Sequence, residues 1–108
     1  MNQTLGDAFD ILVTDIASKA QSDPSASYTA KLLVAGPAYC AKKLGEEGVE
    51  LALAVVGGAR EDIISEAADL LYHLAVALRV SGVSGEEVAA ALESRRGVSG
   101  LEEKAARQ

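Results

Sequence analysis

The chain has 108 residues, of which 49% are hydrophobic and 4% aromatic, and its formal net charge is −6. This length fits a single domain over residues 1–108, and the negative charge argues against nucleic acid or an anionic membrane surface as a partner. No apolar run approaches the ~20 residues that a membrane helix needs. The one cysteine, Cys40, and an N-terminus without the pattern of a signal peptide lead us to expect a cytoplasmic protein.

The first part of the chain predicts two helices separated by a loop. Residues 4–21 place apolar side chains at helical spacing with polar residues between them. The segment SDPSAS, residues 22–27, breaks this pattern and is typical of a loop. A short helix is expected over residues 28–36, because Gly36 and Pro37 end it.

Two long helices are expected next, over residues 38–56 and 60–80, joined by a glycine pair. Because this connection is short, the second helix should return antiparallel to the first. Ser84 then opens a shorter helix, with Glu87 placed to complete a capping box. Residues 97–108 are expected to form a polar tail with partial order. No alternating strand pattern occurs in the sequence, so the predicted class is all-α, an antiparallel bundle built around a long-helix hairpin.

Each long helix carries a stripe of charged or titratable side chains three or four positions apart, a spacing that places them on one face. The charged or titratable members of the stripes are Lys43, Glu47 and Glu50 on the first helix and Asp62, Glu66, Asp69 and His73 on the second. Glu50 and Glu66 each lie about six residues, or ~9 Å, from the turn, and Glu47 and Asp69 lie one helical turn further out. Four carboxylates therefore converge if the two stripes face each other.

Converging carboxylates repel each other and resist desolvation, so they take up protons, diverge into solvent or bind cations. Hard oxygen ligands without a thiolate cluster favour Mg²⁺, with Mn²⁺ as a substitute. A carboxylate cage for Mg²⁺ commonly serves a phosphate-bearing substrate, whose remaining charge Lys43 could meet. The alternative is a solvated helix face whose glutamates pair with Lys42 and Lys43, and such pairs contribute little.

The pattern Glu47-x-x-Glu50, then fifteen residues, then Glu66-x-x-Asp69 resembles the metal motif of the all-α nucleoside-triphosphate pyrophosphohydrolases, the MazG-like superfamily. Four blocks in the same order resemble the phosphoribosyl-ATP pyrophosphohydrolases more specifically. These blocks are SYTAKLL, KKLGEEGVE, EAADLLYHLAV and the closing SGLEEKAAR. Together they span nearly the whole chain.

This resemblance implies a dimeric helical enzyme that uses Mg²⁺ to hydrolyse phosphoribosyl-ATP to phosphoribosyl-AMP and pyrophosphate, the second step of histidine biosynthesis. The implied metal ligands are Glu47, Glu50, Glu66 and Asp69. Glu46 or Glu47 would act as the catalytic base, and Lys43 would contact phosphate. The implied substrate side also includes Tyr28, Thr29, Lys31 and His73.

Simpler interpretations remain for several of these residues. Tyr28 and Thr29 could serve only to open the short helix, with Thr29 or Ser27 as its cap. His73 could be a hydrogen-bonded structural histidine, whereas Tyr72 is expected to pack. Cys40 is expected to be a small, semi-buried hydrophobe.

Gly48 departs from the family, which more often has alanine at this position. Glycine inside a helix costs up to about 1 kcal/mol and would let another backbone approach. Two rival functions remain open from the sequence. One is a related pyrophosphohydrolase that destroys non-canonical nucleotides, and the other is a non-catalytic helical dimerisation module.

Overall fold

The computed structural model describes residues 2–97 and 100–107, which form helices and no strand. The all-α prediction is therefore confirmed. The helices in chain order are α1 Leu5–Lys19, α2 Tyr28–Ala35, α3 Pro37–Gly57, α4 Arg60–Val80, α5 Gly85–Ser94 and α6 Gly100–Ala106. None of these helices combines the length and the apolar character that crossing a membrane requires.

Side-chain caps begin three of the helices where the sequence places them. Thr4 accepts a hydrogen bond from the N–H of Asp7 at the start of α1, and Ser27 accepts one from Ala30 at the start of α2. The capping box of Ser84 and Glu87 begins α5, as predicted. Each cap satisfies backbone donors that the first helical turn leaves free.

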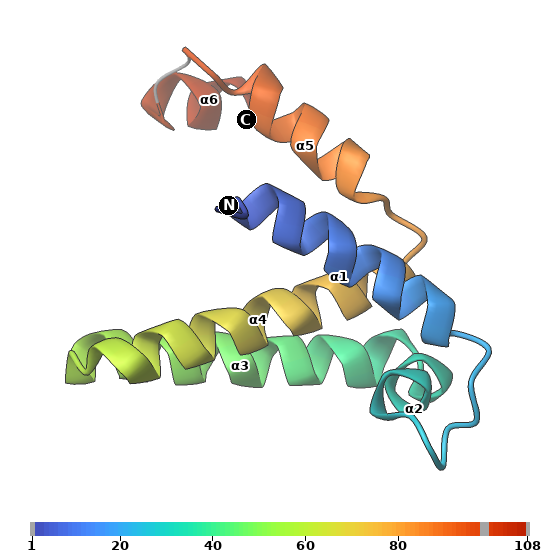
Figure 1. The fold of residues 1–108 in the computed structure, drawn as a ribbon. Helices are drawn as coiled ribbons and strands as arrows, with labels where there is room; N and C mark the ends of the chain where they lie inside the picture. Colours follow the sequence, from blue (N-terminus) through green and yellow to red (C-terminus); the bar gives the residue numbers. More distant parts are fainter. Residues whose placement is uncertain (1, 98–99, 108) are drawn as a thin grey trace.

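Helices α3 and α4 lie side by side and antiparallel, and they form the long hairpin on which the rest of the chain is arranged (Figure 1). Gly58 ends α3 with a φ of 80°, a left-handed conformation that favours glycine, and its N–H donates to the carbonyl of Ala54. A Cβ added at Gly48 would meet no described atom within 4 Å. The close backbone approach expected at Gly48 is therefore not found within the described chain.

The core lies where α1 and α2 pack against the α3–α4 hairpin, near the start of α3 and the second half of α4 (Figure 1). Its buried hydrophobic members are Ile16, Leu32, Cys40, Ala75 and Val76. Cys40 is fully buried rather than half-buried, and its thiol donates to the carbonyl oxygen of Leu32 at 3.2 Å. This bond joins α2 to α3 at the centre of the core.

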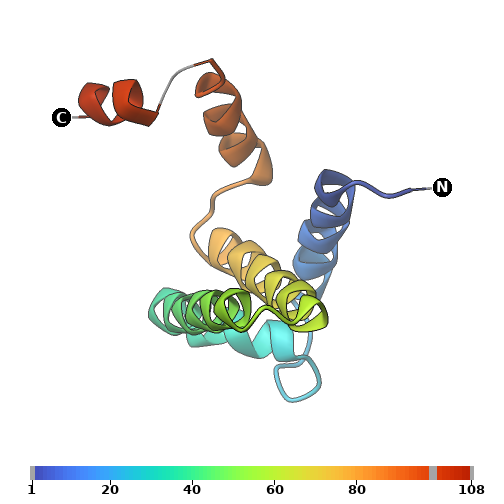
Figure 2. The same ribbon diagram turned by 90° about the vertical axis from the view of Figure 1, so that its left-hand side faces the viewer.

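Helices α5 and α6 stand away from the hairpin in both views (Figures 1 and 2). Within the predicted polar tail over residues 97–108, residues 100–106 form the helix α6, and residues 98, 99 and 108 lie outside the described residues. The reason is local, because leucine, glutamate, lysine and alanine all favour the helical conformation.

Candidate active site

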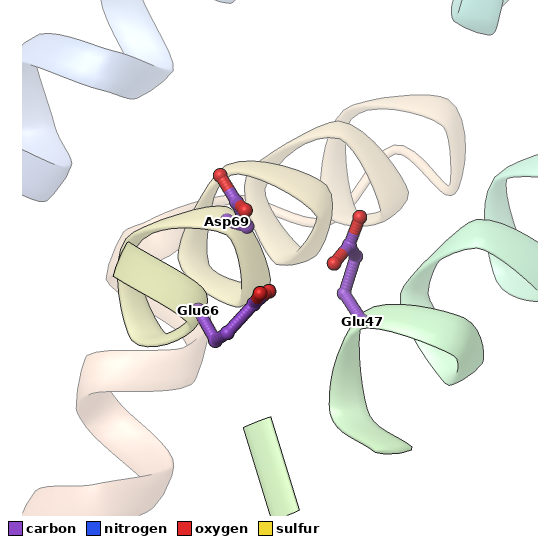
Figure 3. Close-up of side chains that lie close together, drawn as sticks. All are labelled: Glu47, Glu66 and Asp69. Carbon is purple, nitrogen blue, oxygen red and sulfur yellow. The ribbon is translucent and has the colours of Figure 1, made fainter. Parts of the chain in front are cut away.

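Three carboxylates from the two long helices converge at the middle of the hairpin (Figure 3). Glu47 extends from α3, and Glu66 and Asp69 extend from α4, with one oxygen of each lying within 4.8 Å of the others. The short turn between α3 and α4 fixes which residues face each other, because residues at equal distances from the turn lie side by side. The structure thus brings together three of the four carboxylates that the sequence places on the facing stripes.

Glu50 is exposed and lies outside this closest group of three. Its carboxylate nevertheless lies beside the other acids, since its charge and a hydrogen bond with it help to raise the pKa of both Glu47 and Glu66. Glu50 is therefore placed to complete the set of oxygen ligands from the solvent side.

Two oxygen atoms of this cluster are buried without a hydrogen-bond partner among the described residues, Oε2 of Glu47 and Oε1 of Glu66. An unsatisfied buried acceptor is costly, so such an atom calls for a proton, a water or an ion. Burial is the largest cause of the raised pKa of both groups, and neighbouring carboxylates add to it. The protein alone therefore disfavours the fully ionised cluster.

The donor set fits a small divalent cation. Mg²⁺ binds oxygen at about 2.0–2.1 Å, so ligands on opposite sides of the ion lie about 4.2 Å apart. The three carboxylate oxygens lie within 4.8 Å of one another, so they would have to draw closer together to hold one ion jointly. Oxygen donors without a thiolate suit Mg²⁺ or Mn²⁺.

His73 lies one helical turn beyond Asp69 on α4 and is only 6% exposed. Its Nε2 is 3.7 Å from Oε1 of Glu47, a distance longer than a hydrogen bond. Burial first, and then the charge of Lys43, lowers the pKa of His73. Both effects favour the neutral imidazole, which can serve a polar ligand without adding a positive charge.

Lys43 and Glu46 form an ion pair at the edge of the cluster, with Nζ and Oε1 3.3 Å apart. The hydrogen bond with Glu46 is the largest cause of the raised pKa of Lys43, and the nearby Tyr28 adds to it. The charge of Lys43 also contributes to the lowered pKa of His73. A cation is thus held next to the carboxylates.

The start of α2 brings two further predicted residues to α4. Thr29 is buried, and its hydroxyl is hydrogen-bonded to that of Tyr72. The ring of Tyr28 lies 6.4 Å, between centroids, from the rings of both Tyr72 and His73. Lys31, in contrast, is exposed on α2 and makes no ion pair with a described carboxylate, so it is not part of the cluster.

Sequence reasoning assigned only packing to Tyr72. The side chain does pack against the core, but it also contacts His73 edge-on with ring centroids 5.1 Å apart. Its hydroxyl holds the start of α2 through Thr29. The sequence offered one indication of this role, because Tyr72 directly precedes His73. Its hydrogen-bond partner Thr29 could not be inferred, because it lies 43 residues away in the chain.

Comparisons with known proteins agree with this geometry. The profile of a family described as Phosphoribosyl-ATP pyrophosphohydrolase matches residues 12–96. A phosphoribosyl-ATP pyrophosphatase of Methylobacterium nodulans is 57% identical over 86% of this chain and 87% of its own length. Another of the same name, from Caulobacter vibrioides, is 49% identical over 99% of both chains. The chain therefore belongs to the phosphoribosyl-ATP pyrophosphohydrolase family.

Proposed function

We propose that this protein hydrolyses phosphoribosyl-ATP to phosphoribosyl-AMP and pyrophosphate in the second step of histidine biosynthesis. The observation that carries this proposal is the cluster of Glu47, Glu66 and Asp69, in which two buried oxygens have no partner among the described residues. Family membership and the names of the relatives support the choice of substrate.

The proposed cofactor is Mg²⁺, with Mn²⁺ as a substitute, held by Glu47, Glu50, Glu66 and Asp69. When bound, such an ion neutralises phosphate oxygens and lowers the pKa of a water molecule. The carboxylates contribute by being fixed on two packed helices, so that the site requires little rearrangement. Glu50, which like Asp69 is exposed, completes the proposed set.

The reaction requires a proton acceptor, for which Glu46 and Glu47 are the two candidates. As the oxygen of water bonds to phosphorus, the anhydride bond between the α- and β-phosphorus atoms breaks and pyrophosphate leaves. The carboxylate takes the proton of the attacking water. Glu47 lies within the carboxylate group, whereas Glu46 is 48% exposed and pairs with Lys43. Glu47→Gln should therefore lose more activity than Glu46→Gln.

The substrate side of the proposal uses residues around the cluster. Lys43 would contact phosphate, since its ammonium lies at the edge of the carboxylate group. Tyr28, Thr29 and His73 lie together next to it. For Lys31 the substrate role rests on the family resemblance alone.

We also propose that two copies of the chain form a homodimer through the turn end of the hairpin. On α3 the residues Val49, Leu53 and Val56 lie at helical spacing and are 61%, 66% and 86% exposed. On α4, Ile64 is exposed near the same end. The radius of gyration is 15.8 Å, compared with about 13 Å for a compact domain of this length. A second copy would cover this apolar surface.

The proposed setting is the cytoplasm, with a small nucleotide as ligand and no nucleic acid or membrane as partner. The formal net charge of −6 opposes binding to either polyanionic surface. Cys40 is buried and reduced, as suits a reducing compartment.

The test is pyrophosphate release from phosphoribosyl-ATP and from a panel of nucleoside triphosphates, with Mg²⁺ and with excess EDTA. We expect release from phosphoribosyl-ATP, abolished by EDTA and restored by Mg²⁺. Preference for another nucleotide would favour a related pyrophosphohydrolase that destroys non-canonical nucleotides. No release from any nucleotide would favour a non-catalytic helical module.

A further inference from the structure

A cavity of about 520 Å³ lies between the end of α1, the loop that follows it and the start of α2. Its lining consists of Lys19, Tyr28, Thr29, Tyr72 and three residues of the loop, Ser22, Ala26 and Ser27. Its volume falls in the range of sites that hold small ligands. The family resemblance assigned no role to Lys19 or to this loop.

The walls of this cavity include an aromatic surface. The rings of Tyr28 and Tyr72 are inclined by only 19°, with centroids 6.4 Å apart. Both tyrosines line the cavity, so both rings can contact a planar ligand bound there. The hydroxyl of Tyr72 is held by the buried Thr29, which fixes the ring before any ligand binds. Such a surface suits a heteroaromatic base.

The aromatic surface continues directly into the carboxylate cluster. Tyr72 contacts His73 edge-on, and His73 in turn lies 3.7 Å from Glu47. A ligand whose phosphates lie at the carboxylates could therefore extend its ring system along these side chains into the cavity. Along the site the phosphates would then come first, at the carboxylates, followed by the base and then by any group attached to the far side of the base.

Lys19 is the only charged side chain among the described residues that line the cavity. No described carboxylate forms an ion pair with it, so its ammonium is available to an anionic ligand. The beginning of α2, at Ser27 and Tyr28, faces the same space with the positive end of its helix dipole. The lining of the cavity is thus positive, although the chain as a whole is negative.

We propose that this cavity binds the base and the phosphoribosyl group of the substrate, with Tyr28 and Tyr72 against the base and Lys19 paired with the phosphoribosyl phosphate. This inference rests on the proposed function, because it takes phosphoribosyl-ATP as the substrate. It makes Lys19 the residue that distinguishes phosphoribosyl nucleotides from ordinary ones, since only the former carry a phosphate beyond the base.

The experiment measures binding by calorimetry in the presence of Mg²⁺, using phosphoribosyl-AMP and AMP as probes. The wild type should bind phosphoribosyl-AMP about tenfold more tightly than AMP, as one charge-assisted contact gives. Lys19→Gln should remove this difference, and Lys19→Arg should restore it. The matched control is Lys104→Gln, a lysine also placed in the last turn of its helix, which should change neither affinity. Equal affinities of the wild type for both probes, or an unchanged preference in Lys19→Gln, would overturn the proposal.

The aromatic part has its own pair of variants. Tyr28→Leu should weaken binding of both probes about tenfold, because stacking of the base on the ring is lost, whereas Tyr28→Phe should retain it. Equal binding by Tyr28→Leu and the wild type would overturn this part. These measurements need no turnover. Failure of the proposed function would appear instead as a lack of pyrophosphate release from phosphoribosyl-ATP by the wild type.

Discussion

The two ends of the α3–α4 hairpin differ in how their apolar residues are covered. At the inner end, α1 and α2 pack around Cys40 and Val76, which are fully buried. At the turn end, Leu53 and Val56 are equally apolar but mostly exposed. The carboxylate cluster lies between the two ends (Figures 1 and 3). One chain therefore completes its own core on one side of the site and leaves an exposed apolar surface on the other, where we propose that a second copy docks.

The inner end should be the more sensitive to truncation. Leu32 is fully buried at the centre of the core, and Leu32→Ala should lower the free energy of unfolding by about 3 kcal/mol because it leaves a cavity. Urea denaturation at two protein concentrations measures this loss, which should be similar at both. A loss below about 1 kcal/mol would contradict the assignment of the core.

The turn end should instead control association. Leu53→Asp places a charge in the proposed apolar interface, so the variant should sediment as a monomer while the wild type sediments as a dimer. Leu101→Asp, an equally drastic change at another exposed leucine, should leave the dimer intact. Analytical ultracentrifugation decides the matter, and an unchanged mass for Leu53→Asp would exclude this face as the interface.

The carboxylate cluster between the ends should respond to pH with a definite sign. Burial, with neighbouring charges, raises the pKa of Glu66 above 4.5. The folded state therefore binds more protons than the unfolded state just above that pH, and its stability falls as pH rises through the raised pKa. Without metal, Glu66→Gln should be more stable than the wild type at pH 8, and this gain should disappear near pH 4.

Glu87 provides the opposite control. Its hydrogen bonds with Ser84 lower its pKa, so its contribution to stability is present above pH 4.5 and is lost as pH falls through the lowered pKa. Glu87→Gln should therefore be less stable than the wild type at pH 8. Thermal unfolding in EDTA at both pH values measures both variants. A loss of stability in Glu66→Gln at pH 8 would mean that the ionised carboxylate of Glu66 does not destabilise the fold in the absence of metal.

The smallest effect is expected at Gly48, which lies in the middle of α3 between the two ends. Since a Cβ there would meet no described atom within 4 Å, Gly48→Ala should raise stability by about 0.5–1 kcal/mol through the lower entropy of the unfolded chain. Denaturant unfolding measures the gain. A destabilised dimer with an unchanged monomer would instead place the partner's backbone against Gly48.

The hairpin and its facing carboxylates were predictable because they depend on local rules. Helical spacing places Glu47 on the stripe of α3 and Glu66 and Asp69 on that of α4, and a short glycine turn fixes their relative level. The absence of Glu50 from the closest group of three was not predictable, because it depends on side-chain conformation rather than on helical spacing.

The cavity was not predictable for a different reason. It depends on the path of the loop over residues 22–27, which brings Tyr28 and Thr29 of α2 to Tyr72 of α4. No spacing rule relates residues 43 positions apart in different helices. The helix α6 was not predicted, because the only evidence for it in the sequence is that its residues favour helix, and this preference alone rarely stabilises so short a segment.

The claim that the three carboxylates form the catalytic centre is tested most directly by pyrophosphate release from phosphoribosyl-ATP by Asp69→Asn at saturating Mg²⁺. The matched control is Glu61→Gln on the same helix, where the acid lies in the first turn and outside the cluster. We predict that Asp69→Asn loses at least about 10³-fold in rate while its helical circular-dichroism signal is retained, and that Glu61→Gln is nearly unchanged. Full activity in Asp69→Asn would contradict the assignment of the site.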